Sequence, residues 1–349
     1  MFGLLQRGIA ALKKTIIVLA LVLSTAGFLA AKEPLSFTGQ SCIELPQLVL
    51  LDKAAVKPVG ERIRVCSYNT QDFYDGINDD TNATPAMAER HARGIATLLD
   101  EIDPDIVVLE EVENAVALKM LNDALKKPYP VAFITQFASL WGEEQKLNIA
   151  VLSRVPLAGL RELDFGYFKG SGRPPRGMLS FFVELGQGRR LLVYGVHLKS
   201  NFGDRVKNEF QRLSAMKILR ADADEMLSRY SQNEWEVLVM GDTNVDPEDQ
   251  QFAKDSTFRP MRGWVDLWSG RPLAERITLP TRHGDPALEF APVTFDRFFA
   301  STNLVATPWK GGQPQVLQRG VDTKSVFTLP GQSDIHVSDH YPIYLDIVK

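Results

Sequence analysis

From residue 61 onward, continuous apolar runs of strand length alternate with segments whose apolar residues recur at helical spacing. A continuous apolar run indicates a strand covered on both faces, and its alternation with amphipathic helices indicates an α/β fold. The predicted strands are residues 62–69, 105–112, 147–154, 178–185, 190–198, 236–242, 294–301 and 341–348. The predicted helices are residues 85–103, 113–127 and about 207–228. The pattern therefore predicts one large α/β domain with two sheets between helices. We expect the second helix to end in lysines, as the helix dipole prefers.

The first 31 residues differ in character from the rest of the chain. Three basic residues precede an uncharged apolar run of seventeen residues, Thr15 to Ala31, and no acidic residue occurs before Glu33. This pattern is typical of a secretory signal, or of an N-terminal anchor if it is not cleaved, because seventeen residues is at the short limit for a membrane span. We expect an exported protein, periplasmic or secreted. Residues 32–60 are predicted to form an N-terminal extension, and residues 61–349 the main domain.

The charge of the chain limits what it can bind. The formal net charge is −4, and it becomes −7 without the first 31 residues, which carry three positive charges and no negative ones. A chain with this negative net charge has no overall positive potential to attract nucleic acid and bind it tightly. An enzyme of this charge can still bind a phosphate locally through a metal. The two cysteines, Cys42 and Cys66, could form a disulfide in an oxidising compartment, or Cys66 could be an inert core thiol.

Polar side chains stand where the predicted strands end. Asn69, Glu110, Glu111, His197, Asp242 and Asn244 follow buried runs, Asp339 and His340 come directly before the last strand, and Asp296 lies inside one. The carboxyl ends of strands are where open α/β folds bind their ligands. The other three histidines, His91, His283 and His336, are interpreted as ordinary surface residues.

This set of side chains favours metal-assisted hydrolysis. Carboxylate and carboxamide oxygens suit Mg²⁺, with Mn²⁺ or Ca²⁺ as alternatives, and the lack of a clustered Cys/His set argues against structural zinc. Two histidines beside carboxylates can move protons and stabilise charge on a phosphoryl oxygen. The sequence has neither a GxxxxGK[ST] phosphate loop nor a GxSxG nucleophile turn, so attack by activated water fits best.

Six short motifs occur in order along the chain: "YNTQDFYD", "PDIVVLEEVEN", "VHLKS", "GDTNVD", "FDRFFAS" and "SDHYPI". Together they resemble the ordered motifs of the endonuclease/exonuclease/phosphatase superfamily, over about residues 62 to 346. The resemblance implies a four-layer α/β sandwich, with two packed central sheets flanked by helices. It also implies a Mg²⁺-dependent phosphoesterase.

The same resemblance assigns roles to individual residues. Asn69 and Glu111 would hold the metal, with Asp339 near it and Glu110 in the position of the family's Gln. Asp242 and Asn244 would position the attacking water and the phosphate. His340 would contact the scissile phosphate, with its tautomer fixed by Asp296, and His197 would stabilise the transition state or protonate the leaving oxygen. Either Asp242 or His340 could take the proton of the water. Arg176 and Lys199 are candidate substrate contacts, although each could instead be an ordinary surface residue.

The predicted activity is that of an exported, metal-dependent nuclease, most similar in "LEEVEN" and "VHLKS" to exported bacterial members. The partner would be DNA or RNA bound without sequence specificity, since no reading module is recognisable. The alternative is a phosphatase or phosphodiesterase for inositol phosphates or phospholipids such as sphingomyelin. A scaffold that only binds would have no reason to keep the complete set of site residues. No stable protein partner is implied, and membrane contact is expected only through an uncleaved N-terminal segment.

Overall fold

The computed structural model describes residues 36–37, 43–77, 83–137, 146–166, 168–170, 172–229, 235–283, 290–306, 309–324 and 328–349. The predicted signal or anchor and Cys42 lie outside these residues. Within the described part, no helix is both long enough and apolar enough to cross a membrane. Cys66 is a free thiol, and its burial raises its pKa well above the usual value.

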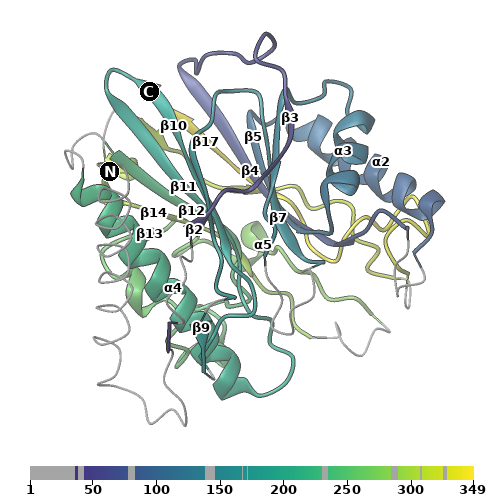
Figure 1. Ribbon diagram of the computed structural model, residues 1–349. Coiled ribbons are helices and arrows are strands. Elements are labelled where there is room, and N and C mark those ends of the chain that lie inside the picture. Colours follow the sequence, from purple (N-terminus) through teal and green to yellow (C-terminus); the bar gives the residue numbers. More distant parts are fainter. Residues whose placement is uncertain are drawn as a thin grey trace.

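Two large sheets pack face to face (Figure 1). The first has the strand order β13-β14-β12-β11-β10-β8-β2: β13 (Val265–Asp266), β14 (Asp296–Ala300), β12 (Trp235–Asp242), β11 (Arg189–His197), β10 (Met178–Gly186), β8 (Ala158–Leu163) and β2 (Ile43–Glu44). The second has the order β15-β17-β4-β5-β7-β6-β3: β15 (Lys310–Gly311), β17 (Ile343–Val348), β4 (Arg62–Phe73), β5 (Ile106–Val112), β7 (Asn148–Ser153), β6 (Val131–Ile134) and β3 (Gln47–Leu51). In addition β16 (Gln315–Val316) pairs with β17, and β1 (Ser36–Phe37) pairs with β9 (Phe168–Lys169).

Helices cover the outer face of each sheet (Figure 1). On the eight-stranded sheet lie α2 (Pro85–Ile102) and α3 (Ala115–Ala124), and on the seven-stranded sheet lies α4 (Arg205–Ser228). The shorter elements are α5 (Leu273–Arg276), α6 (Thr302–Ala306), η2 (Gln250–Phe252) and η3 (Arg259–Met261).

Strand β5 shows why the apolar runs are continuous. Ile106 and Val108 pack into the core between the two sheets, whereas Val107 and Leu109 pack against the helices on the outer face. Alternate side chains of a strand point to opposite faces, so a strand buried on both sides needs apolar residues at every position. The strands of the other sheet divide their side chains in the same way. The four layers, helices, sheet, sheet and helices, are therefore separated by three apolar cores. The predicted α/β sandwich is thereby confirmed.

The three long helices begin at residues whose side chains cap the free amide groups of the first turn. Thr84 accepts a hydrogen bond from Met87 N, Asn114 from Val116 N and Ala117 N, and Asp204 from Lys207 N. The prediction that the second helix ends in lysines is wrong, because α3 ends at Ala124 and has no basic residue in its last turn. Leu125 is already extended, and Lys126 N donates to the Asp100 carboxylate of α2, which turns the chain away from the helix axis.

The segment predicted as an N-terminal extension supplies an edge strand to each large sheet. Strand β2 pairs with β8 of the seven-stranded sheet, and β3 pairs with β6 of the eight-stranded sheet. Strand β3 is largely exposed, with Leu48 and Leu51 half open to solvent. These short strands therefore extend the two sheets at their rims.

Two histidines that the sequence suggested were surface residues are buried, so that interpretation is wrong for His91 and His336. His91 lies on the inner face of α2, with its ring 5.0 Å from the ring of Phe73 in an edge-to-face contact. His336 Nε2 lies 2.9 Å from Gln71 Oε1, and its Nδ1 accepts from Asp322 N. Both contact the last residues of β4, and the helical or loop context in the sequence could not reveal this burial.

The burial of His91 predicts a pH-dependent loss of stability. Burial lowers the pKa of His91 to about 3 in the folded protein, so between that value and about 6.5 the unfolded chain binds a proton that the folded protein does not. Stability from this group therefore falls as pH falls. From pH 7 to 4.5 we expect the free energy of unfolding to drop by about 2–3 kcal/mol more in the wild type than in His91→Gln.

The difference between the two proteins is the quantity to measure, by urea unfolding at both pH values. Glu162 acts with the opposite sign, because burial raises its pKa to about 8 and its contribution to stability is lost as pH rises. It acts equally in both proteins and cancels in the difference. Equal pH dependence of the wild type and His91→Gln would contradict the prediction.

Candidate active site

The strand pairing brings the predicted site residues to one edge of the two sheets. In the seven-stranded sheet, His197 at the end of β11 is paired with Asp242 at the end of the parallel strand β12. Asp242 is in turn paired with Asp296 at the start of β14. In the other sheet, Asn69 of β4 is in register with Glu110 of β5. Parallel strands end at the same edge of a sheet, so the functional groups of both sheets meet there.

Positive φ angles turn several of these residues into the cleft. Among the non-glycine residues that the structure describes, six have positive φ, and four of them line the cleft: Gln71 (51°), Asp72 (51°), Glu111 (63°) and Asn244 (55°). The pairing of β5 with both of its neighbours shifts in register around Glu111. This break in alternation directs Glu111 to the cleft, whereas Glu110 is fully buried and accepts from Ser67 Oγ at 2.7 Å. Backbone strain of this kind persists where the surrounding structure enforces it, which is common at functional sites.

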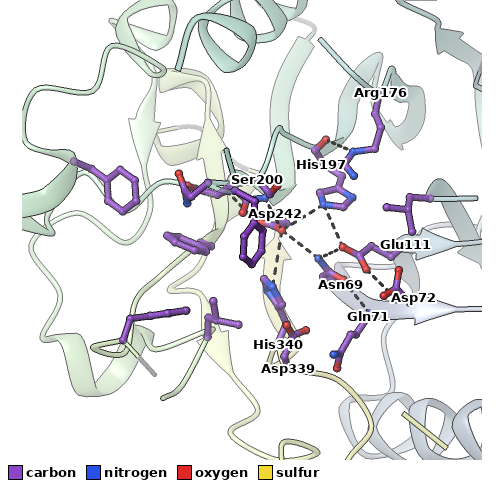
Figure 2. A pocket seen from close by; sticks show the side chains of 18 of the residues that line it. Asn69, Gln71, Asp72, Glu111, Arg176, His197, Ser200, Asp242, Asp339 and His340 are labelled. Carbon is purple, nitrogen blue, oxygen red and sulfur yellow. Dashed lines mark hydrogen bonds and ion pairs between the residues drawn. The ribbon is translucent and has the colours of Figure 1, made fainter. Parts of the chain in front are cut away.

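Asp242 is at the centre of the hydrogen bonds in the site (Figure 2). Its Oδ2 accepts from Asn69 Nδ2 at 3.1 Å and from Asn244 Nδ2 at 2.9 Å, and its Oδ1 accepts from Asn244 N at 2.8 Å. The same Oδ2 lies 3.6 Å from His197 Nε2 and 3.9 Å from His340 Nε2. Burial raises the pKa of Asp242 to about 6. The carboxylate is therefore held rigidly and titrates close to neutral pH.

His340 and Asp296 form a hydrogen-bonded pair. His340 Nδ1 lies 2.7 Å from Asp296 Oδ2, and Asp296 is fully buried at the start of β14. Burial alone would lower the pKa of His340, but the neighbouring carboxylates of Asp296 and Asp242 outweigh it and hold this pKa well above the usual value. His340 is thus a protonated imidazolium that presents Nε2–H to the cleft.

His197 has the opposite character. Burial, reinforced by the charges of Arg176 and His340, lowers its pKa well below the usual value, so its ring is neutral. Its Nε2 lies 3.4 Å from Glu111 Oε1, and within the described part of the chain its Nδ1 has no hydrogen-bond partner. A neutral imidazole is a poor acid, so His197 can donate or accept a hydrogen bond but is not suited to protonating a leaving oxygen at neutral pH.

These groups line an open cleft of about 650 Å³ (Figure 2). The cleft has a polar end, formed by Asn69, Gln71, Asp72, Glu111, Arg176, His197, Asp242, Asn244, Asp339 and His340. The rest of the lining is provided by Leu147, Ser200, Asn201, Phe202, Arg205, Gln251, Phe252, Leu279, Phe290 and Phe295. All the predicted site residues except Asp296 and Lys199 line the cleft, and Asp296 contacts the lining residue His340.

Three carboxylates crowd one side of the polar end. Burial, together with the charges of Asp72 and Asp339, raises the pKa of Glu111 to about 7. Glu111 Oε1 also faces Asn69 Nδ2 at 3.2 Å, and its Oε2 accepts from Asp72 N at 2.8 Å. Neighbouring acids that repel one another are stabilised by a cation, and oxygen ligands of this kind suit a hard divalent ion. The residues present therefore fit a metal at Glu111, with Asn69, Asp72 and Asp339 within its surroundings.

A second group could in principle hold a cation. Ligand atoms of Asp242, Asp296 and His340 lie within 4.8 Å of one another. However, Asp296 Oδ2 already accepts the short hydrogen bond from His340 Nδ1, and His340 carries a positive charge. A metal there would have to displace that proton and that contact. The residues around Glu111 therefore fit a cation better than this group does.

Arg176 and Lys199, the predicted substrate contacts, occupy different environments. Arg176 lines the cleft, where its Nη2 donates to Leu198 O at 3.0 Å. Lys199 is not part of the lining, and its ammonium folds back onto its own loop, donating to Ser200 Oγ at 2.8 Å and Phe202 O at 3.2 Å. Lys199 therefore braces the loop, whereas the Arg176 side chain can reach a ligand.

Sequence reasoning missed several residues that shape the site. Gln71 and Asp72 follow Asn69 within the motif "YNTQDFYD", where the close succession of polar residues was the available signal. Ser338 Oγ donates to Asn69 O and accepts from His340 N, which links the two halves of the site. Asn201 Nδ2 donates to Asn244 O at 2.8 Å. That contact joins loops that are far apart in the sequence, and no local pattern predicts it.

The sequence matches the profile of the Endonuclease/Exonuclease/phosphatase family over residues 66–340, and the chain belongs to this family. Members of the family are divalent-metal-dependent phosphoester hydrolases, and the chain has their phosphoesterase fold. No curated protein sequence matches the chain significantly.

Several solved structures share the fold. TDP2 from D. rerio, complexed with a single-strand DNA product, is 19% identical, with a TM-score of 0.56 over 83% of this chain and 100% of that one. SmcL is 17% identical, with a TM-score of 0.59 over 82% and 99% of the two chains. A family protein from Bacteroides thetaiotaomicron is 17% identical, with a TM-score of 0.54 over 82% and 95%. At these identities the likeness shows a common fold.

Proposed function

We propose that this protein is an exported, divalent-metal-dependent nuclease that hydrolyses phosphodiester bonds of DNA or RNA without sequence specificity. The main support for hydrolysis is that one open cleft holds a carboxylate cluster, the protonated His340 and Asp242, and the pKa of Asp242 is raised to about 6. Mg²⁺ is the proposed metal, and when bound at Glu111 it would polarise the phosphate and neutralise charge on its oxygens.

The side chains of the site suit an in-line attack by water. Asp242 would accept the proton of the water, because its pKa lies near neutral pH and its oxygens are oriented by Asn69 and Asn244. His340 would direct Nε2–H at a non-bridging phosphate oxygen and meet the negative charge that develops there. The neutral His197 would contribute a hydrogen bond without changing its protonation.

We favour nucleic acid over the other candidate substrates for two reasons. The cleft is lined by Arg176 and Arg205, which can contact phosphates on either side of the scissile bond. The TDP2 structure that shares this fold was solved with a single-strand DNA product. A phospholipid or inositol phosphate is the second candidate, and the apolar wall of the cleft, formed by Phe252, Leu279, Phe290 and Phe295, favours it.

A substrate panel distinguishes the two candidates. Purified protein with Mg²⁺ is incubated with single- and double-stranded DNA, RNA, an inositol polyphosphate and sphingomyelin vesicles, with His340→Ala as the control. The proposal predicts metal-dependent cleavage of nucleic acid that is lost in the variant. Release of phosphate or phosphocholine with nucleic acid left intact would reject the nuclease and keep a phosphoesterase site.

A further inference from the structure

Phe202 is an exposed aromatic side chain on the rim of the catalytic cleft. It is 69% exposed, yet it lines the cleft together with Ser200, Asn201 and Arg205. It belongs to the loop between β11, which ends at His197, and α4. A large apolar side chain this exposed contributes little to the core and is free to contact a bound substrate.

The loop that carries Phe202 is fixed by hydrogen bonds. Asn208 Nδ2 and Lys199 Nζ both donate to Phe202 O, at 2.8 and 3.2 Å. The preceding residue, Asn201, donates through Nδ2 to Asn244 O at 2.8 Å and so ties the loop to the catalytic turn. The exposed ring therefore stands on backbone that is held relative to Asn244.

A buried arginine of α4 supports the loop from below. Arg212 is 1% exposed, and its Nη1 donates to Lys199 O and Asn201 Oδ1 at 3.2 and 3.1 Å. Its Nη2 donates to Asp255 Oδ2 at 2.7 Å, so the guanidinium is itself held in place. A charged group buried with this many partners makes the loop rigid, and a rigid rim loses little entropy when it binds a ligand.

We propose that Phe202 stacks on an unpaired base next to the scissile phosphate and so makes the enzyme prefer single-stranded nucleic acid. The proposal rests on the nuclease function proposed above. Every base has a π-face, whereas the Phe ring has no hydrogen-bonding group, so such stacking positions the substrate without reading its sequence. A base inside a duplex is already stacked on its neighbours and would have to be extruded first. Arg205, which also lines the cleft, provides a cation for the adjoining phosphate.

A neighbouring side chain provides a matched control. Val206, in the first turn of α4, is 78% exposed but does not line the cleft. If Phe202 stacks on a base, only Phe202 should matter. If instead the two exposed side chains insert into a lipid surface, both should matter.

The test combines variants with altered substrates. The substrate is a short single-stranded oligonucleotide with one cleavable phosphodiester among methylphosphonates, carrying either a base or an abasic tetrahydrofuran residue beside that bond. We expect Phe202→Ala to lower kcat/KM about 10- to 100-fold on the substrate with the base. On the abasic substrate, which the wild type should already cleave more slowly, the same variant should change kcat/KM less than threefold. Phe202→Trp should retain activity on the base-containing substrate, Phe202→Leu should not, and Val206→Ala should match the wild type.

Three outcomes would overturn the stacking proposal while leaving the nuclease in place: equal loss on both substrates, full activity of Phe202→Leu, or equal loss in Val206→Ala. Loss of phospholipid-vesicle hydrolysis in both Phe202→Ala and Val206→Ala, with oligonucleotide cleavage unchanged, would assign the loop to a membrane surface. Failure of the wild type to cleave the base-containing oligonucleotide or plain single-stranded DNA would overturn the nuclease proposal itself.

Discussion

Replacement of Asp242 with Asn is expected to lower kcat for phosphodiester hydrolysis by about 1,000-fold or more, with little loss of folded protein. Asp242 Oδ2 accepts from Asn69 and Asn244 and faces both histidines of the cleft, so it is the one oxygen to which every part of the site is connected. An amide is a weaker base than a carboxylate and lacks the negative charge that keeps His340 protonated.

The measurement is oligonucleotide cleavage at saturating substrate, with thermal unfolding followed by circular dichroism. The matched control is Asp224→Asn, which removes the same charge from an exposed position on α4 and should leave kcat within twofold of the wild type. Retention of more than a tenth of the wild-type kcat in Asp242→Asn would contradict the role given to this residue.

The largest expected effect on stability comes from Arg297, which directly follows Asp296 in β14. Its side chain is fully buried and donates to Asp246 Oδ1 at 2.6 Å, to Val245 O at 3.1 Å and to Asp266. Removal of the guanidinium takes the ion pair from Asp266 and one of two ion pairs from Asp246, which still contacts Arg276, in a medium of low polarity. We expect Arg297→Met to lower the free energy of unfolding by about 3–5 kcal/mol.

Urea unfolding with an unchanged m-value would measure that loss. The control is Lys119→Met on α3, where the partner, Asp123, is exposed and the pair should contribute less than about 0.5 kcal/mol. A loss below about 1 kcal/mol in Arg297→Met would show that the network around Asp246 does not hold β14 in place.

The fold was largely readable from the sequence, because its long strands are covered on both faces. Ile106 to Leu109 could only be apolar at every position if a sheet lay on one side and helices on the other, and the structure has that arrangement. The two-residue strands β13, β15 and β16 could not be predicted, since each exists only through pairing with a longer neighbour. The same holds for the two-residue edge strand β2, which pairs with β8.

The site residues at the ends of strands were predicted from the sequence, whereas those in the turns were not. Asp242 and His197 stand at the ends of apolar runs, and the parallel pairing of β11 with β12 puts them side by side. Asp72 reaches the cleft because the backbone after Asn69 adopts positive φ. No local sequence pattern predicts this conformation. Lys199 appeared suited to a substrate and instead braces the Phe202 loop, because its nearest acceptors belong to that loop.

The protonation states of the two histidines in the cleft depend on their surroundings, which the sequence does not give. From the sequence, either His340 or Asp242 could take the proton of the water, and His197 could protonate the leaving oxygen. In the structure, Asp296 and Asp242 keep His340 charged, whereas burial beside Arg176 keeps His197 neutral. The different protonation states of the two histidines follow from their neighbours, and they argue against His197 as the proton donor at neutral pH.

The central claim, metal-dependent hydrolysis of nucleic acid at this cleft, is tested most directly by cleavage of circular single-stranded DNA with the purified wild-type protein. Parallel reactions contain Mg²⁺, Mg²⁺ with excess EDTA, and the chelated sample after Mg²⁺ is restored. We predict that the DNA circles are cut in the first, remain intact in the second and are cut again in the third. Cleavage that continues in EDTA, or intact circles in the presence of Mg²⁺, Mn²⁺ and Ca²⁺ alike, would contradict the account.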